Sequence, residues 1–408
     1  MNTKRKITSV FVSAINNKSK KKNAKQIPFL VIFIATLIFS ACKRTISQED
    51  LTCCDINIDN LDIDAVSFED LFCDIRLIPL ENHSDAMLSS VSKMMVTKDG
   101  YVLLDENQHS SSVCLFSHEG EYRGQVGDIG HGHGEYEYIF DVSADEEKKI
   151  VLSTLHKFMV YNAKGKFLHD YETPSNSYMR NILCYKDGIV CTSNYSGREF
   201  LLHFFDNSFK LKKELLPSYN NQIGNPPRIK NLLQMEGNLL CYCDPYASEL
   251  NIIDIKKMLP RKKYRLQSEH MMTIDKAKKE SKRLDIGNVD VILSYYIDNG
   301  KIICNVRSHD YEVITIELDV ETDKYTMRRQ NGWLPIIYDA HDGYDYTVIS
   351  QTEFLDIINP PSMDDMARWA MAPKLSEEAK EMFKEAYANL GKEITEDNNF
   401  VILKLKKK

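Results

Sequence analysis

Side chains that often bind ligands gather in the predicted longer loops of this sequence, away from its tight turns. Arginine forms paired hydrogen bonds with carboxylate, sulfate or phosphate groups, and exposed aromatic rings stack on sugar or peptide faces. Such residues on the loops of a rigid scaffold are typical of binding sites, although each could instead bond a neighbouring loop. The candidate ligand-binding residues are His109, His156, Tyr195, Arg198, Arg228, Tyr246, Arg307, His309 and Trp333.

A first candidate metal site lies in a glycine-rich segment. His131, His133 and Glu135 alternate with glycines there. Imidazole nitrogens and a carboxylate are zinc ligands, and alternate residues share one side of an extended chain. The three glycines favour a loop instead, and no further ligand spacing supports the site.

A second metal hypothesis uses histidines from three equivalent loops. His109, His156 and His309 could converge on a central channel and hold a catalytic metal, as in some extracellular propeller lyases and lactonases. The remaining repeats supply no obvious set of carboxylate partners. The sequence has no P-loop, dinucleotide fingerprint, HExxH helix or Gly-x-Ser-x-Gly elbow. A metal-dependent lyase or hydrolase is therefore the alternative interpretation, and the favoured one needs no cofactor.

Two kinds of hairpin recur through the chain and would position these loops. The first is a short apolar strand, a tight turn ending in glycine and a second apolar strand, as in SKMMVTKDGYVLLDE and LSYYIDNGKIICNV. The second is an alternating strand, a polar turn and another strand, and its aligned residues are separated by 45, 44, 48 and 65 residues (Phe116, Tyr161, Phe205, Ile253, Leu318). Four strands in each 40–50 residues indicate the blades of a β-propeller.

The ends of the propeller are predicted to pair with each other. The sequence contains six first hairpins but only five second hairpins, and a single strand at 400–405 follows the last one. The missing partner is expected at 73–80, because joining both ends in one blade removes open sheet edges. The predicted fold is all-β: a six-bladed β-propeller with four-stranded blades, strand closure by the two termini and small helical insertions. One insertion, at 376–390, has a capping serine and helical spacing of apolar residues.

Asp-Gly and Asn-Gly pairs predict type I′ turns centred on those two residues. Centring a turn on Asp187-Gly188 places Cys184 opposite Cys191, within reach for a disulfide. The two cysteines would then be a hydrogen-bonded pair of an antiparallel ladder, and in such pairs the Cα atoms lie farther apart than in the non-hydrogen-bonded pairs. Reduced core cysteines are therefore favoured over a disulfide framework.

The amino terminus has the features of an export signal. Residues 1–25 carry eight Lys or Arg and no acid, and an uncharged, mostly apolar run occupies 27–41. Cys42 follows Ser-Ala, which resembles a bacterial lipobox and predicts lipidation of that cysteine. The alternative is an uncleaved anchor, although the run is short for a bilayer. Either way the rest of the protein lies outside the cytoplasm.

Removing the signal changes the charge of the protein. The whole chain carries −7, so loss of eight positive charges leaves −7 − 8 = −15. Nucleic-acid binding needs surplus Lys and Arg, so this class of partner is excluded. Residues 42–70 are polar and acidic and are expected to form a tether, with the propeller occupying 71–408.

Two fragments carry a family resemblance. Residues 127–136, GDIGHGHGEY, resemble a Gly-rich loop of the NHL-like six-bladed β-propeller lipoproteins of Gram-negative bacteria, with His133 in place of the usual Pro. The segment at 396–405 is similar to the closing strand of that family. The resemblance implies a propeller and an envelope location, but no settled activity.

The favoured interpretation is a non-enzymatic outer-membrane lipoprotein, facing the periplasm or the surface. It would use its longer loops to bind a glycan, a peptide or an envelope protein, and its lipid would hold it to the membrane.

Overall fold

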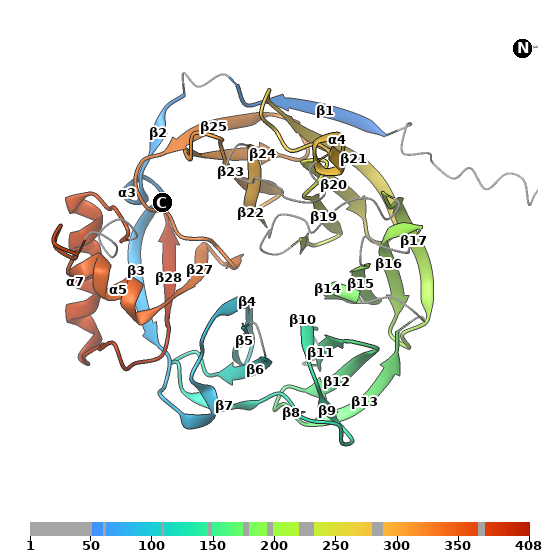
Figure 1. Ribbon diagram of the computed structural model, residues 1–408, viewed down its shortest axis with the longest axis horizontal. Helices are drawn as coiled ribbons and strands as arrows, with labels where there is room; N and C mark the ends of the chain where they lie inside the picture. The colour runs from blue at the N-terminus through green and yellow to red at the C-terminus, as the bar shows by residue number, and fades with distance from the viewer. Residues whose placement is uncertain are drawn as a thin grey trace, which may run out of the picture. The chain divides into compact units, whose positions relative to one another are not determined.

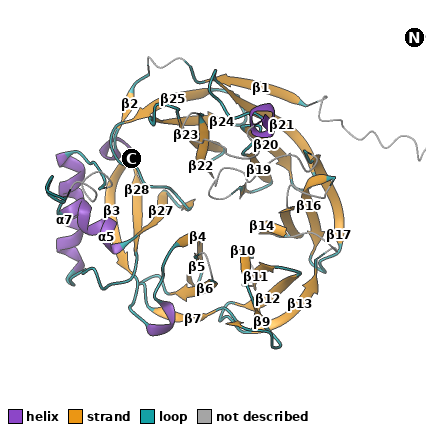
Figure 2. Ribbon diagram, in the orientation of Figure 1, coloured by secondary structure: helices purple, strands orange, loops and turns teal. Residues whose placement is uncertain are grey.

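The computed structural model describes residues 51–59, 63–107, 110–145, 149–173, 179–193, 199–219, 232–279, 289–365 and 372–408. These residues form six sheets of four or five strands and one small two-stranded sheet. The six large sheets are arranged as the blades of a ring (Figures 1 and 2). Their inner strands contact one another in succession and the sixth contacts the first, which confirms the six-bladed propeller. No helix within the described ranges is long and apolar enough to span a bilayer.

The first three blades follow the chain without interruption, each strand pairing antiparallel with the next. Blade 1 contains β4 (Val91–Thr97), β5 (Gly100–Glu106), β6 (Ser111–Phe116) and β7 (Tyr122–Gln125). Blade 2 contains β10 (Ile139–Ala144), β11 (Lys149–Thr154), β12 (Lys157–Asn162) and β13 (Phe167–Glu172). Blade 3 contains β14 (Met179–Tyr185), β15 (Gly188–Ser193), β16 (Phe200–Asp206) and β17 (Leu211–Pro217). The small sheet, β8 (Asp128–Ile129) with β9 (Glu135–Tyr136), lies between blades 1 and 2 in sequence.

Blades 4 and 5 each gain a fifth strand from the amino-terminal segment. Blade 4 contains β18 (Leu233–Glu236), β19 (Leu239–Asp244), β20 (Glu249–Asp254) and β21 (Leu259–Gln267), and β1 (Thr52–Asn57) pairs parallel with β21. Blade 5 contains β22 (Val291–Asp298), β23 (Lys301–Arg307), β24 (Val313–Asp319) and β25 (Tyr325–Gln330), and β2 (Ala65–Val66) pairs parallel with β25. Figure 1 shows both added strands along the outside of the ring.

These added strands differ from the expected tether at 42–70. Ile56 and Val66 are each 1% exposed, so both added strands are anchored to the propeller by a buried side chain. The difference arises because both strands pair in parallel with residues about 200 or more positions away, which no local pattern reveals.

The two chain ends meet in blade 6, as predicted. Its strands are β26 (Asp339–His341), β27 (Tyr344–Ile349), β28 (Val401–Lys407) and β3 (Phe72–Pro79), in that order. Strand β28 pairs antiparallel with β3, with Val401 opposite Pro79 and Leu405 opposite Ile75. Pairing the two ends closes the ring within one sheet.

The predicted turn centres hold at some hairpins and are displaced by one residue at others. Asn299-Gly300 has φ values of 51° and 73°, as a type I′ turn requires. In the Lys-Asp-Gly hairpins the turn is instead Lys-Asp, because Gly188 already pairs with Tyr185. A Cβ on Gly188 would come within 1.9 Å of a backbone carbonyl oxygen on the facing strand. The displacement puts Cys184 opposite Ile189, and neither Cys184 nor Cys191 is in a disulfide.

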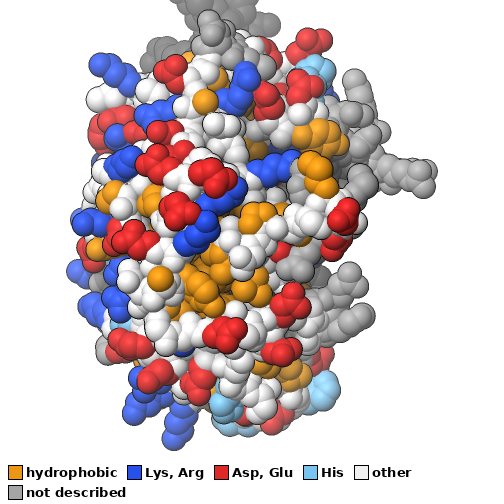
Figure 3. All heavy atoms as spheres, turned by 90° about the vertical axis from the view of Figure 1, so that its left-hand side faces the viewer, with side chains coloured by type: hydrophobic (Ala, Val, Ile, Leu, Met, Phe, Trp, Pro, Cys, Tyr) orange, Lys and Arg blue, Asp and Glu red, His pale blue; other side chains and the backbone are white. Residues whose placement is uncertain are grey.

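Helices cover the outer side of blade 6. Helix α5 (Gln351–Ile358) and α7 (Glu377–Leu390) have N-cap serines at Ser350 and Ser376, the second as predicted. They pack with α3 (Phe68–Leu71) against β3 and β28. Figure 3 shows this side of the molecule, with acidic and basic side chains around an apolar area. The remaining short helices are η2 (Ser84–Ala86) and α4 (Ile274–Lys279).

Candidate functional site

Two of the predicted ligand-binding aromatics serve packing instead. Tyr246 is fully buried, and its backbone N–H donates to the carboxylate of Asp244. Trp333 packs against Phe68 and Phe383, and its indole N–H donates to Glu353 at 3.1 Å. Both side chains stabilise the loops that carry them.

Three further candidates come from two connections, one in blade 2 and one in blade 5. His156 is exposed between β11 and β12 of blade 2. Arg307 ends β23 of blade 5 and lies 5.4 Å from the ring centre of Tyr311. The Nδ1–H of His309 donates to the carboxylate of Asp290 at 3.1 Å, and the imidazole ring stacks on that of His270 with the ring centres 3.8 Å apart. The remaining candidates His109, Tyr195, Arg198 and Arg228 lie outside the described residues, as does Cys42.

The glycine-rich segment does not bring its three candidate metal ligands together. His131 pairs with Glu137 at 2.9 Å, while the ring of His133 packs edge-on against Phe167. Glu135 accepts a hydrogen bond from the backbone N–H of Gly132 and so closes the loop on itself. Within the described ranges, no group of three or more His, Cys, Asp or Glu residues is arranged to hold a metal ion. Of the second proposed metal set, His156 and His309 belong to blades 2 and 5, and His109 lies outside the described residues.

One inter-blade boundary differs from the others. Apolar clusters join blade 1 to 2, 2 to 3, 3 to 4, 4 to 5 and 6 to 1. At the boundary between blades 5 and 6, the apolar face of blade 6 packs largely against α3, α5 and α7. Blade 5 presents a mostly polar face there, which includes a hydrogen-bonded group of Ser294, Asn305, Thr315 and Gln330.

A pocket of about 510 Å³ lies at this boundary. It is lined by β22–β25 of blade 5, by β2, α3 and β3, and by the end of β28. Asn299 and Gly343, which belong to tight turns, also line it. The pocket therefore opens on the side of the tight turns, opposite the loops that the sequence favoured.

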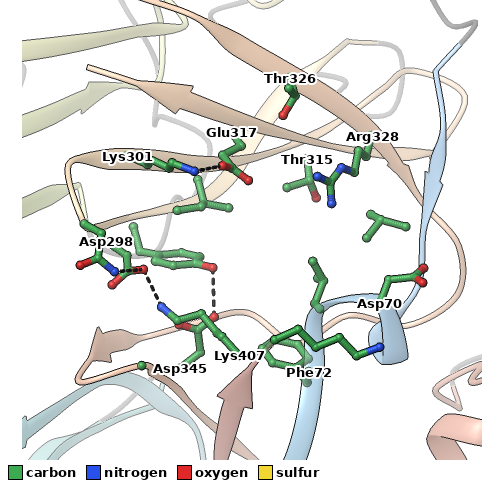
Figure 4. A pocket seen from close by; sticks show the side chains of 17 residues that line it. Asp70, Phe72, Asp298, Lys301, Thr315, Glu317, Thr326, Arg328, Asp345 and Lys407 are labelled. Atoms are coloured by element: carbon green, nitrogen blue, oxygen red, sulfur yellow. Dashed lines mark hydrogen bonds and ion pairs between the residues drawn. The ribbon is translucent and has the colours of Figure 1, made fainter. Parts of the chain in front are cut away.

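Ion pairs form one end of the pocket (Figure 4). Lys407 Nζ lies 2.6 Å from Asp298 Oδ2 and 3.0 Å from Asp345 Oδ1, and the Tyr296 hydroxyl donates to Asp345 at 3.1 Å. Burial raises the pKa of Asp345, although Lys407 opposes this shift. Burial disfavours the charge on Lys407, but Asp298 and Asp345 outweigh it and raise the pKa of the ammonium group. These groups join blade 5 to blade 6 and are held in fixed positions.

The wider part of the pocket combines a second ion pair with free cations. Lys301 pairs with Glu317 across β23 and β24. Arg328 extends from β25 toward Thr315 (Figure 4), and Lys408 also lines the pocket. Asp70 accepts from both the backbone N–H and the hydroxyl of Ser67 at 2.8 and 2.6 Å. Those bonds, followed by the charges of Lys408 and Arg328, lower the pKa of Asp70.

The sequence contained a signal for this pocket. Each propeller sheet lies between two others, so its strands are normally apolar on both faces, as in GYVLLDE of β5. The strands KIICNVR and VITIELD of blade 5 alternate strictly between buried apolar and partly exposed residues that are mainly polar. Strict alternation indicates that one face lacks an apolar neighbour.

Comparison with known proteins identifies the family. A family model described as a domain of unknown function, DUF4934, matches residues 52–406. The chain belongs to the DUF4934 family. The match begins at β1, so the DUF4934 region includes the added strands as well as all six blades.

Solved structures were also found that are similar to this DUF4934 protein. A protein of Bacteroides fragilis NCTC 9343, described as a candidate exported protein, superposes with a TM-score of 0.62 at 16% identity. The alignment covers 88% of this chain and all of that one. The Neurospora crassa Pan2 WD40 domain has a TM-score of 0.40 at 12% identity, over 63% of this chain and 71% of that one. A search of curated proteins gave no match.

Proposed function

We propose that this DUF4934 protein is an exported, lipid-anchored binding protein that holds a small polar ligand between blades 5 and 6. The observation that carries the proposal is the polar face of blade 5, which lines a pocket of about 510 Å³ at the boundary with blade 6. Pockets of roughly 300–1,000 Å³ with a few convergent polar groups are typical ligand sites.

The energetics support a role other than stability. Closely packed apolar side chains would hold the blades together better, because burial of apolar surface contributes about 25 cal/mol per Å² and a water-filled polar pocket forgoes this. Buried ion pairs such as Lys407 with Asp345 are often no more stabilising than apolar residues of similar volume. A polar face with prearranged donors and acceptors is instead suited to binding, because little ordering remains when the ligand enters.

A thermal-shift screen of the purified protein against sugars, oligosaccharides, amino acids and short peptides tests the proposal. Thr326 lines the pocket on β25 and is exposed, so Thr326→Trp should fill the pocket without disturbing the core. Leu168→Trp, at an exposed position of β13, is the matched control. A compound that stabilises the wild type and the control but not Thr326→Trp is expected. Hits that act equally on all three proteins would place binding elsewhere and refute the proposal.

The anchor is proposed at Cys42, within an outer-membrane lipoprotein. Its support is the basic segment, the short apolar run and the Ser-Ala-Cys sequence. We expect the wild type in the outer-membrane fraction, with a diacylated amino-terminal cysteine detected by mass spectrometry. Cys42→Ser should abolish acylation, whereas Cys53→Ser, at an exposed cysteine, should leave it unchanged. Detection of an intact peptide spanning residues 38–46 in the wild type would contradict the proposal.

A further inference from the structure

The proposed function does not specify the chemical class of the ligand. The charged side chains that line the pocket limit which classes can bind there. We infer that the ligand is a hydroxyl-rich acid with one negative charge, of the uronic-acid class, whose carboxylate binds Arg328 and Lys408. This inference rests on the proposed function, because it names the ligand of the same pocket.

The four cationic side chains of the pocket fall into two groups. Lys301 pairs with Glu317, and Lys407 pairs with both Asp298 and Asp345, so these two cations are neutralised. Arg328 and Lys408 have no side-chain hydrogen bond or ion pair to any residue that the structure describes. A guanidinium group can bind a carboxylate through two parallel hydrogen bonds, which makes Arg328 the stronger contact.

The balance of charge near these two cations matches one negative charge. Asp70 is the remaining acid that lines the pocket, and the hydrogen bonds from Ser67 satisfy it. Arg328, Lys408 and Asp70 together carry +1 at this end of the pocket, whereas Lys407, Asp298 and Asp345 carry −1 at the other end, so the lining as a whole is neutral. Without its signal the chain carries −7 − 8 = −15 and would repel a highly charged anion, so a single acidic group at the Arg328 end is the best match.

The rest of the pocket favours hydroxyl groups over a peptide. In the Lys301–Glu317 pair a donor lies beside an acceptor, an arrangement that matches two adjacent hydroxyls of a sugar ring. Thr315 and Thr326 add hydroxyl groups to the lining. The cations at the other end are already paired, so no second acidic group is needed there.

Titration calorimetry with three small probes tests this class. D-Glucuronate has the acid and the hydroxyls, D-glucose has only the hydroxyls, and N-acetylalanine has only the acid. We expect D-glucuronate to bind at least about tenfold more tightly than either of the others, since a charge-assisted bond contributes on the order of a factor of ten. Arg328→Gln should remove this preference. Arg329→Gln should keep it, because Arg329 pairs with Glu312 and does not line the pocket.

Several outcomes would overturn the inference and leave the proposed function standing. Equal binding of D-glucose and D-glucuronate would show that the acid is not recognised, and tighter binding of N-acetylalanine would indicate a peptide terminus. Absence of binding by all three probes at about 20 mM would exclude the uronic-acid class. The proposed function is tested separately by the wider screen with Thr326→Trp.

Discussion

Lys407 should be the strongest electrostatic contact between blades 5 and 6. Its ammonium group bridges Asp298 on β22 and Asp345 on β27, and the two carboxylates are 16% and 2% exposed. Lys407→Met keeps most of the volume of the side chain but leaves both carboxylates without their cation. Removing one partner of a buried pair costs about 3–5 kcal/mol. Because Lys407 itself is 23% exposed, we expect a loss near the lower end, about 3 kcal/mol of unfolding free energy.

The loss should depend on pH in a defined direction. Without Lys407 the folded-state pKa of Asp345, already raised by burial, should rise further above its unfolded value. The folded variant would then hold a proton more tightly than the unfolded chain, so its stability should decrease as pH rises. The difference between wild type and variant should therefore be largest at neutral pH and smallest near pH 4, about the unfolded pKa of aspartate.

Urea denaturation followed by tryptophan fluorescence measures this difference. Lys301→Met is the matched control, because its ion pair with Glu317 is also in the pocket but is 47% and 37% exposed. An exposed pair contributes about 0.5 kcal/mol, so the control should scarcely change the midpoint. Equal midpoints for the two variants at neutral pH would refute the idea that Lys407 joins the blades.

Three further predictions concern other parts of the ring. Burial raises the pKa of Asp244 to about 6, so the unfolding free energy should decrease as the pH rises from about 4 to about 6. Asp244→Asn should remove that decrease, as measured by urea titrations at a series of pH values. Gly188→Ala should lower the melting temperature much more than Gly300→Ala, because an added Cβ meets a carbonyl oxygen at 1.9 Å at the first position and open space at the second. A thiol-reactive dye should label Cys53 and Cys73 first in the native protein, because both are exposed; rapid labelling of the buried cysteines would contradict the fold.

Features encoded by neighbouring residues could be predicted from the sequence. Hairpins, their spacing and the closing strand at 400–405 follow from local alternation and turn residues, and the pairing of β28 with β3 confirmed the closure. The one-residue displacement at Gly188 could not be predicted, because it depends on a contact with the facing strand. The strands β1 and β2 escaped prediction for the same reason, since their partners are distant in sequence.

The location of the pocket depends on how whole blades face each other. Sequence reasoning selected loop residues such as Tyr246 and Trp333, but the packing of the buried Tyr246 and of the partly buried Trp333 depends on neighbours from other elements. The polar face of blade 5 was visible as alternation in β23 and β24. The alternation indicates a pocket only if one knows that both faces of a blade are normally covered by neighbouring blades. That coverage is a property of the whole ring and not of one strand.

Hydrogen–deuterium exchange tests the central claim most directly. It should be measured on the wild-type protein with and without the screening compound that gives the largest thermal shift. The account predicts slower exchange in the segments that line the pocket, at 66–72, 296–303 and 315–328. Slower exchange confined to the loops of the opposite side, around His156 and at 308–312, would contradict it.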